Sequence, residues 1–166
     1  MLVNTKELLQ DSRGGIASFN VVDFDMARAC IEAAEETQRP VIIGVAVRHW
    51  KTLGGPLFVP SVRALCLNSE VPAALHLDHA GPDNLNIIDQ ALESGFSSIM
   101  IDASKMPFRT NIEVTKGSGR ACPAVQCLGG SGTGSASGRG GCGRSCRYRG
   151  GLFTRNPAKP LNSVML

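Results

Sequence analysis

The chain has 166 residues, of which 43% are hydrophobic and 19% charged, and it carries a formal net charge of +3. This length suits one ordinary domain, and the apolar fraction is high enough for a packed core, which excludes a wholly disordered protein. No apolar run reaches membrane-spanning length, and the first residues lack the basic-then-apolar order of a secretory signal. We therefore expect a soluble, cytoplasmic protein that does not use a membrane.

The charges are unevenly distributed along the chain. Residues 1–116 hold all 14 acidic and 10 of the 17 basic residues, whereas residues 117–166 hold seven basic residues and no acidic one. Residues 117–151 also contain 12 of the 19 glycines. We therefore interpret residues 1–116 as a folded acidic domain. Residues 117–166 are a basic, low-complexity tail, expected to be disordered because it has no apolar period.

The first unit of the domain pairs a predicted strand with a predicted helix. The apolar run Gly15–Val22 predicts a buried strand. Asp23 suits the N-cap of a helix that is expected to run to about Gln38, because Pro40 prevents further helix. The apolar positions of this helix repeat at intervals of three and four residues, at Met26, Ala29, Cys30, Ala33 and Ala34.

Two further strands enclose the second predicted helix. Val41–Val47 is a continuous apolar run of the kind found in parallel strands, and Ala73–Asp78 predicts the third strand. Between them, a Gly-Gly-Pro loop leads to a helix near Pro60–Asn68. Pro60 is expected in its first turn, where a missing backbone N–H is tolerated.

The last part of the domain repeats the same order. Asp83 is expected to cap a third helix, and Gly95 to end it. Ser97–Asp102 predicts a fourth strand. A fourth helix should begin near Pro107 and continue to Lys116.

Strands that alternate with helices in this way predict an α/β fold with a parallel sheet and right-handed crossovers. The sheet could be open and doubly wound, or it could close into a barrel. No Gly-x-Gly-x-x-Gly follows the first strand, which argues against a dinucleotide site. Polar residues instead follow the strands, as in (β/α)8 barrels, whose chemistry lies at the carboxyl ends of the strands. A full barrel needs eight units and about 250 residues, so four units make half of one.

The densest group of ionisable residues is in the segment VPAALHLDHA, residues 71–80. In a regular strand, His76 and Asp78 face one side and His79 the other, but a turn after Asp78 would bring His79 to the side of Asp78. A neutral imidazole is a zinc ligand, and an adjacent carboxylate serves as a general acid or base. The spacing is equally consistent with a core histidine at 76 and with Asp78 and His79 capping the next turn. His49, the remaining histidine, is expected to be a solvated loop residue.

Several segments together resemble one known family. The run from MLVNTKELLQ through ASFNV, VPAALHLDHA and GFSSIMIDASKMPFRTNIEVTK resembles the N-terminal half of class II, metal-dependent ketose-bisphosphate aldolases, which include fructose- and tagatose-bisphosphate aldolases. The resemblance covers residues 1–116. It implies about the first four βα units of a TIM barrel, a catalytic zinc, a sugar phosphate substrate and a homo-oligomer.

The resemblance also implies roles for single residues. Asp78 matches the family's catalytic proton donor and acceptor, and His79 matches its first zinc ligand. Asp102 matches a carboxylate near the metal that can serve an alternative metal position, although capping of the following turn is equally consistent. Asn20 matches a strand-one residue that lines the substrate pocket. His76 matches the motif and is expected to support the site from behind.

The implied reaction is the reversible aldol cleavage of a ketose 1,6-bisphosphate to dihydroxyacetone phosphate and glyceraldehyde 3-phosphate. Zinc acts as a Lewis acid on the ketone oxygen, and Asp78 exchanges a proton with the hydroxyl that becomes the aldehyde. The family's glutamate-bearing next strand and its two further zinc histidines have no counterpart after Lys116. We therefore expect little or no activity from the chain as translated.

The tail leaves three interpretations open. Its four cysteines, Cys122, Cys127, Cys142 and Cys146, loosely match a zinc site, and RGG-like pieces beside Tyr148 could bind nucleic acid, although the low aromatic content disfavours that partner. The chain would then be a non-catalytic binding protein. It could also be an accessory subunit of a full-length relative. Alternatively, the reading frame has slipped near Lys116, since residues 127–134 can encode Val-Ser-Val-Glu-Ala-Glu-Leu-Gly, the family's next strand, in a shifted frame.

Overall fold

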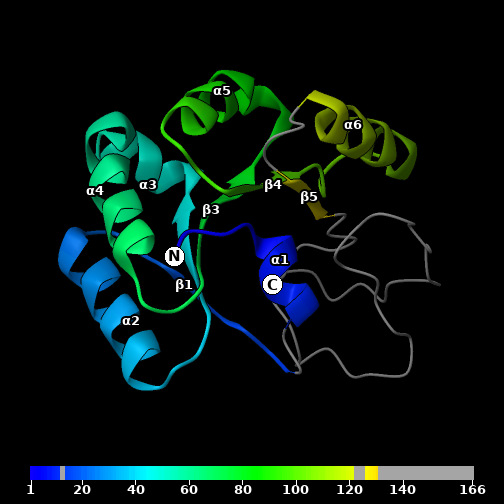
Figure 1. The fold of residues 1–166 in the computed structure, drawn as a ribbon. Helices are drawn as coiled ribbons and strands as arrows, with labels where there is room; N and C mark the ends of the chain where they lie inside the picture. The colour runs from blue at the N-terminus through cyan, green and yellow to red at the C-terminus, as the bar shows by residue number, and fades with distance from the viewer. Residues whose placement is uncertain (12–13, 122–125, 131–166) are drawn as a thin grey trace, which may run out of the picture.

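The computed structural model describes residues 1–11, 14–121 and 126–130, and within them five strands form one parallel sheet in chain order (Figure 1). The strands are β1 (Ala17–Asn20), β2 (Val41–Ala46), β3 (Ala73–Ala80), β4 (Ser98–Asp102) and β5 (Gln126–Gly130). Each strand pairs in parallel with the next one along the chain. The predicted parallel sheet is therefore confirmed.

Helices follow the first four strands as predicted, and the structure adds two helices that were not predicted, one before β1 and one directly after β2. The helices are α1 (Thr5–Asp11), α2 (Phe24–Glu36), α3 (Val47–Thr52), α4 (Gly55–Asn68), the short 3₁₀ helix η1 (Pro82–Asn84), α5 (Leu85–Glu93) and α6 (Phe108–Ala121). Figure 1 shows α2, α4, α5 and α6 around the outside of the curved sheet, with α1 on its other side. This arrangement is part of an α/β barrel. None of the helices in the described ranges is long and apolar enough to cross a membrane.

Strands β2 and β3 are buried on both faces over most of their length, which explains why they are nearly continuous apolar runs. Residues at alternate positions, such as Ile43, Leu75 and Ile99, are fully buried in the main core beneath the outer helices. On the opposite face, Leu8 of α1 packs in a second, smaller core that includes Ile42 and Ala74. Each buried Leu or Ile contributes about 1.5–3 kcal/mol, so the outer core supplies most of the stability. The inner face of the sheet is covered by α1 at one end and carries polar residues at the other.

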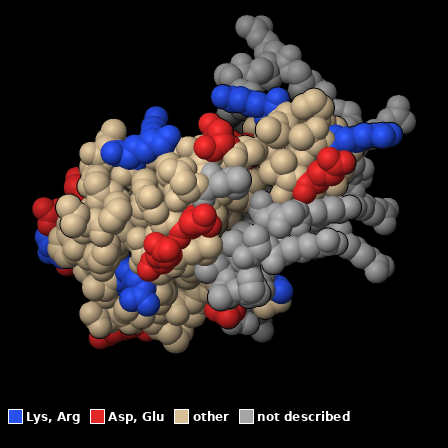
Figure 2. All heavy atoms as spheres, turned by 90° about the horizontal axis from the view of Figure 1, so that it is seen from above, with Lys and Arg blue, Asp and Glu red and all other residues tan. Residues whose placement is uncertain are grey.

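The outer surface carries charges of both signs. Figure 2 shows Lys and Arg side chains interspersed with Asp and Glu side chains on one face of the described part. Mixed charge of this kind is typical of a solvated surface, whereas a nucleic-acid interface concentrates basic residues.

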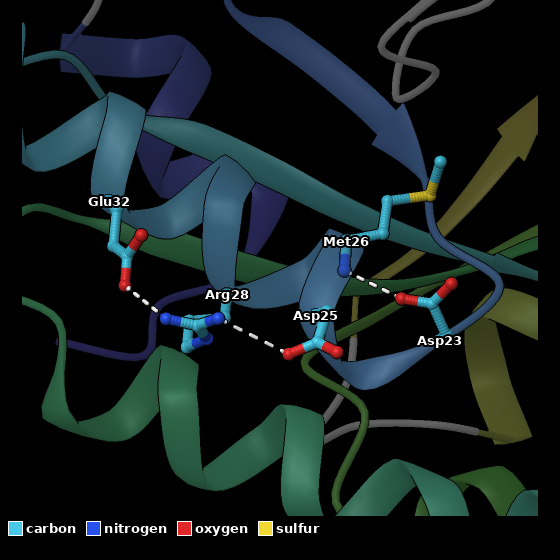
Figure 3. Close-up of polar contacts among 5 residues, drawn as sticks. All are labelled: Asp23, Asp25, Met26, Arg28 and Glu32. Carbon is cyan, nitrogen blue, oxygen red and sulfur yellow. Dashed lines mark hydrogen bonds and ion pairs between the residues drawn. The ribbon is translucent and has the colours of Figure 1, made fainter.

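Polar contacts within the first turns of α2 stabilise the start of this helix (Figure 3). The carboxylate of Asp23 accepts a 2.7 Å hydrogen bond from the backbone N–H of Met26, which confirms the predicted N-cap. Such a cap contributes about 1 kcal/mol. Arg28 pairs with Asp25 at 3.3 Å and with Glu32 at 3.1 Å. These pairs are exposed and each adds only about 0.2–0.5 kcal/mol.

The buried face of α2 differs from the prediction at three of its five positions, since Met26, Ala29 and Ala33 are exposed. Ala27, Ile31 and Ala34 are buried, whereas Met26 is 44% exposed. Met26 lies in the first turn beside the carboxyl end of β1, where no further layer covers it in the described part of the chain. The helix ends at Glu36, two residues before the predicted end.

Two predicted helix starts are wrong. Helix α4 begins at Gly55 and has Pro56 in its first turn, so Pro60 lies inside the helix. The preceding Gly54 has a φ of 63°, a left-handed conformation that separates α4 from α3, a helix that the sequence did not predict. Asp83 lies in η1 and does not cap α5, whose N-cap is Asn84. The short 3₁₀ turn takes up the residues that were expected to start the helix.

The two ends of the sheet also differ from prediction. The first strand was predicted to be buried, but all four residues of β1 are exposed: β1 has a neighbouring strand on one side only, and none of its residues belongs to either buried core. The regular structure does not end at Lys116: α6 continues to Ala121, and β5 pairs with β4 from Gln126. The tail interpretations that depend on Cys122, Cys142, Cys146 and Tyr148 fall outside the described residues.

Candidate active site

Four polar residues meet at the carboxyl ends of β1, β3 and β4. The Asn20 amide nitrogen donates a 2.8 Å hydrogen bond to Oδ2 of Asp78. Nδ1 of His79 lies 2.7 Å from Oδ2 of Asp102, and its Nε2 lies 3.9 Å from Oδ1 of Asp78. Because parallel strands end at one edge of the sheet, residues far apart in sequence become neighbours. The structure thus brings together Asn20, Asp78, His79 and Asp102.

An irregularity in β3 places His79 in this group. The register between β3 and β4 shifts between Leu77 and Ala80, and His79 has a φ of 55°. This bulge turns the His79 side chain away from the outer helices and toward Asp102. The sequence predicted that the strand ends at Asp78 and turns there, but β3 continues to Ala80 and the irregularity lies within it. A left-handed histidine costs about 1–3 kcal/mol, and strain of that kind concentrates at functional sites.

Asp102 serves two partners at once. Its Oδ1 accepts a 3.0 Å hydrogen bond from the backbone N–H of Ser104, and its Oδ2 faces Nδ1 of His79. Partial burial raises the pKa of Asp102, but the hydrogen bonds from Ser104 and His79 outweigh it and leave this pKa below its ordinary value. The carboxylate is therefore ionised at neutral pH. It caps the following turn, as one interpretation held, and also orients the imidazole.

His76 lies behind the site in a chain of buried hydroxyls. Its Nδ1 is 2.8 Å from Oγ of Ser98, which is 2.6 Å from Oγ1 of Thr5 in α1. Burial lowers the pKa of His76 to about 4, so the ring is neutral at physiological pH. Sequence reasoning missed Ser98 and Thr5. The alternation of β4 places Ser98 on the face of Asp102, but the sequence around Thr5 carries no sign of this contact.

His49 is not the loop residue that was predicted. It lies in α3, directly after β2, and its Nε2 accepts a 3.1 Å hydrogen bond from Nε of Arg48. Within the part of the chain that the structure describes, no hydrogen bond or ion pair joins it to Asp78 or His79.

The described residues supply one good metal ligand. Because Asp102 binds Nδ1 of His79, Nε2 remains available, and the side chain is 53% exposed. A carboxylate that fixes one ring nitrogen while the other binds a metal is a common arrangement in metalloproteins. However, residues 1–11, 14–121 and 126–130 contain no group of three His, Cys, Asp or Glu side chains that could hold a metal ion. They fit one ligand and not a complete set.

Comparisons of sequence and fold with known proteins indicate one family. Residues 3–128 match the family model described as fructose-bisphosphate aldolase class-II, so the match extends past Lys116, where the resemblance seen in the sequence ends. The chain is 39% identical over 121 residues to 6-phospho-5-dehydro-2-deoxy-D-gluconate aldolase of Halalkalibacterium halodurans, covering 69% of this chain and 41% of that protein. It is 38% identical over 128 residues to fructose-bisphosphate aldolase of Thermus caldophilus, covering 75% and 41%.

Solved structures show the same partial match. The YdjI aldolase of Escherichia coli K12 superposes with a TM-score of 0.68 at 30% identity, covering 74% of this chain and 48% of that one. A fructose-bisphosphate aldolase of Campylobacter jejuni gives a TM-score of 0.64 at 25% identity, covering 80% and 49%. The chain spans about two fifths of the length of the curated relatives and about half of the solved chains.

Proposed function

Since the chain belongs to the class-II fructose-bisphosphate aldolase family, we propose that it carries the N-terminal part of an aldolase active site. The reaction is the reversible cleavage of a ketose 1,6-bisphosphate to dihydroxyacetone phosphate and glyceraldehyde 3-phosphate. The observation that carries the proposal is the line of contacts from Asn20 through Asp78 and His79 to Asp102, at the strand ends where barrel enzymes place their chemistry.

Asp78 is the proposed acid–base residue. The Asn20 amide holds Oδ2, which fixes the carboxylate and leaves Oδ1 to face the substrate. In cleavage, Oδ1 takes the proton of the hydroxyl whose carbon becomes the aldehyde as the carbon–carbon bond breaks. In the reverse direction, the same oxygen returns that proton to the new alkoxide. The side chain is 19% exposed, so it is partly shielded from water and still within reach of a ligand.

His79 is proposed as one ligand of the family's zinc ion through Nε2. When bound, zinc supplies Lewis-acid stabilisation of the negative charge that develops on the ketone oxygen. Asp102 holds the ring through Nδ1, which favours the orienting role for this carboxylate over that of an alternative ligand. The other ligands must come from outside the described residues, so we expect the chain alone to show little or no turnover.

Complementation tests this proposal. The 166-residue chain is mixed with the C-terminal part of the Thermus caldophilus fructose-bisphosphate aldolase, and cleavage of fructose 1,6-bisphosphate is followed by a coupled assay. We expect turnover from the mixture but from neither piece alone, and at least a hundredfold loss with Asp78→Asn. The matched control is Asp89→Asn, which makes the same carboxylate-to-carboxamide replacement at an exposed position of α5. If the relative's own N-terminal part restores turnover and this chain does not, the proposal is wrong.

A further inference from the structure

The hydrogen bond between Asn20 and Asp78 crosses a strand. Asn20 pairs with Gly44 of β2, and Gly44 pairs with His76 of β3, so β2 lies between the two bonded residues. Neighbouring strands lie about 4.8 Å apart, which separates the backbones of β1 and β3 by roughly 10 Å. The Asn20 side chain therefore has to lie across β2 to reach Asp78.

Gly44 leaves the space for this crossing. A Cβ atom built at Gly44 would overlap Oδ1 of Asn20 and lie 3.3 Å from its Cγ. The next nearest atom, the carbonyl oxygen of Phe19, is at an ordinary contact distance of 3.5 Å. The backbone at Gly44 does not need glycine, since the described glycines with positive φ are Gly54 and Gly95. Glycine weakens a strand interior and often marks a close approach by another group, and here that group is the Asn20 amide.

The position of Asp78 relative to His79 depends on this amide. With Oδ2 held by Asn20, Oδ1 of Asp78 stays 3.9 Å from Nε2 of His79, beyond hydrogen-bond distance. Without the amide, the carboxylate is free to turn toward the imidazole and to occupy Nε2, the nitrogen proposed to bind the metal. The space at Gly44 therefore affects both whether the Asp78 carboxylate stays in place and whether Nε2 of His79 stays unoccupied.

We propose that Gly44 is a positioning residue: it admits the Asn20 side chain across β2, and Asn20 in turn holds Asp78 apart from His79. The catalytic part of this inference depends on the proposed aldolase function, whereas the steric coupling of Gly44 to Asn20 does not. The two can therefore be tested separately.

The steric part is tested by a double-mutant cycle in the 166-residue chain. Gly44→Ala, Asn20→Ala and the double variant are compared with the original chain by urea unfolding. We expect Gly44→Ala to lower the midpoint when Asn20 is present and to have no such effect when residue 20 is alanine, because the overlapping atoms are then gone. Gly15→Ala is the control, since no atom lies within 4 Å of a Cβ there. An equal loss in both backgrounds would overturn the proposal, and a Gly44→Ala chain that unfolds but recovers with Asn20→Ala would support it.

Two further measurements test the consequences. In amide NMR spectra of the 166-residue chain, Gly44→Ala should shift the Asn20 side-chain NH₂ pair toward the position of a solvent-exposed amide; an unchanged pair would overturn the proposal. In the complemented enzyme, Gly44→Ala and Asn20→Ala should lower kcat by a similar factor, about tenfold to a hundredfold, with little change in KM and no further loss in the double variant. If the steric cycle behaves as expected and turnover is restored by the relative's own N-terminal part but not by this chain, the coupling stands and the aldolase proposal fails.

Discussion

Replacing Ser98 with alanine should destabilise the protein, because Ser98 lies in the middle of a buried row of hydrogen-bonded side chains. Ser98 is fully buried, and its Oγ contacts both Nδ1 of His76 and Oγ1 of Thr5. The substitution leaves His76 and Thr5, which are 9% and 2% exposed, each without one polar partner. Each such loss lowers the free energy of unfolding by about 1–3 kcal/mol. Part of this cost is offset because the Ser98 hydroxyl, once removed, no longer has to be desolvated on folding. We expect a net loss of about 2–4 kcal/mol.

Urea unfolding followed by the fluorescence of Trp50 provides the assay. Trp50 is the single tryptophan of the chain and is 4% exposed, so its emission reports on loss of the core. Thr5→Val is the matched variant, because it removes the Thr5 hydroxyl with little change of side-chain shape and leaves the contact between Ser98 and His76. Its cost should be smaller, and the double variant should lose less than both single losses added together. A Ser98→Ala chain within about 0.5 kcal/mol of the original would refute the reasoning, since that is the range of ordinary surface changes.

Three further outcomes follow from the structure. The pKa of His76 is 6.5 in the unfolded chain and falls to about 4 in the folded chain. Its contribution to the free energy of unfolding is therefore present above pH 6.5 and is lost as the pH drops toward 4, by up to roughly 3 kcal/mol. His76→Gln should flatten this part of the curve of unfolding free energy against pH. Because β1 is an exposed edge strand on which Phe19 is 46% exposed, we expect contact between copies of the chain at this edge. Phe19→Lys should shift the chain toward monomer in size-exclusion chromatography, whereas the control Leu57→Lys on α4, at 85% exposure, should not. Equal effects of the two variants would contradict a contact between copies at this edge. Translation of the gene in a shifted frame should give Val-Ser-Val-Glu-Ala-Glu-Leu-Gly in place of residues 127–134, and stop codons or unrelated sequence there would exclude a slipped frame.

Most of the sheet could be predicted because its signal is local. Val41–Ala46 and Ser98–Asp102 are apolar runs bounded by proline, glycine or polar residues, and the structure places β2 and β4 within a residue of the prediction. The starts of α4 and α5 could not be placed in this way. Whether Pro56 or Pro60 occupies a first turn depends on how Gly54 directs the chain out of α3, which is a property of the packed structure.

The candidate site was predictable in composition but not in contacts. The motif around Asp78 and His79 stands out in the sequence, and the strand ends indicate which other residues are near. The sequence does not show that His79 adopts a left-handed backbone or that Asn20 spans β2. Both depend on register, which is set by the pairing of strands that are more than twenty residues apart. Gly44 is inconspicuous in a run of apolar residues until this register is known.

The geometry of the site is local to the sheet, and this explains how part of a barrel can hold it. The contacts from Asn20 to Asp78 and from His79 to Asp102 join β1, β3 and β4, and the contact between Asp78 and His79 lies within β3. The outer core beneath α2, α4 and α5 fixes β3 and β4, whereas β1 is held by its pairing with β2. On the inner face, α1 supports β4 through the contact between Thr5 and Ser98. The remaining units of the relatives are therefore not needed to arrange the proposed acid–base residue or the proposed metal ligand. The described residues do not complete a metal site, so the proposed function depends on ligands from outside them rather than on rearrangement of the part already built.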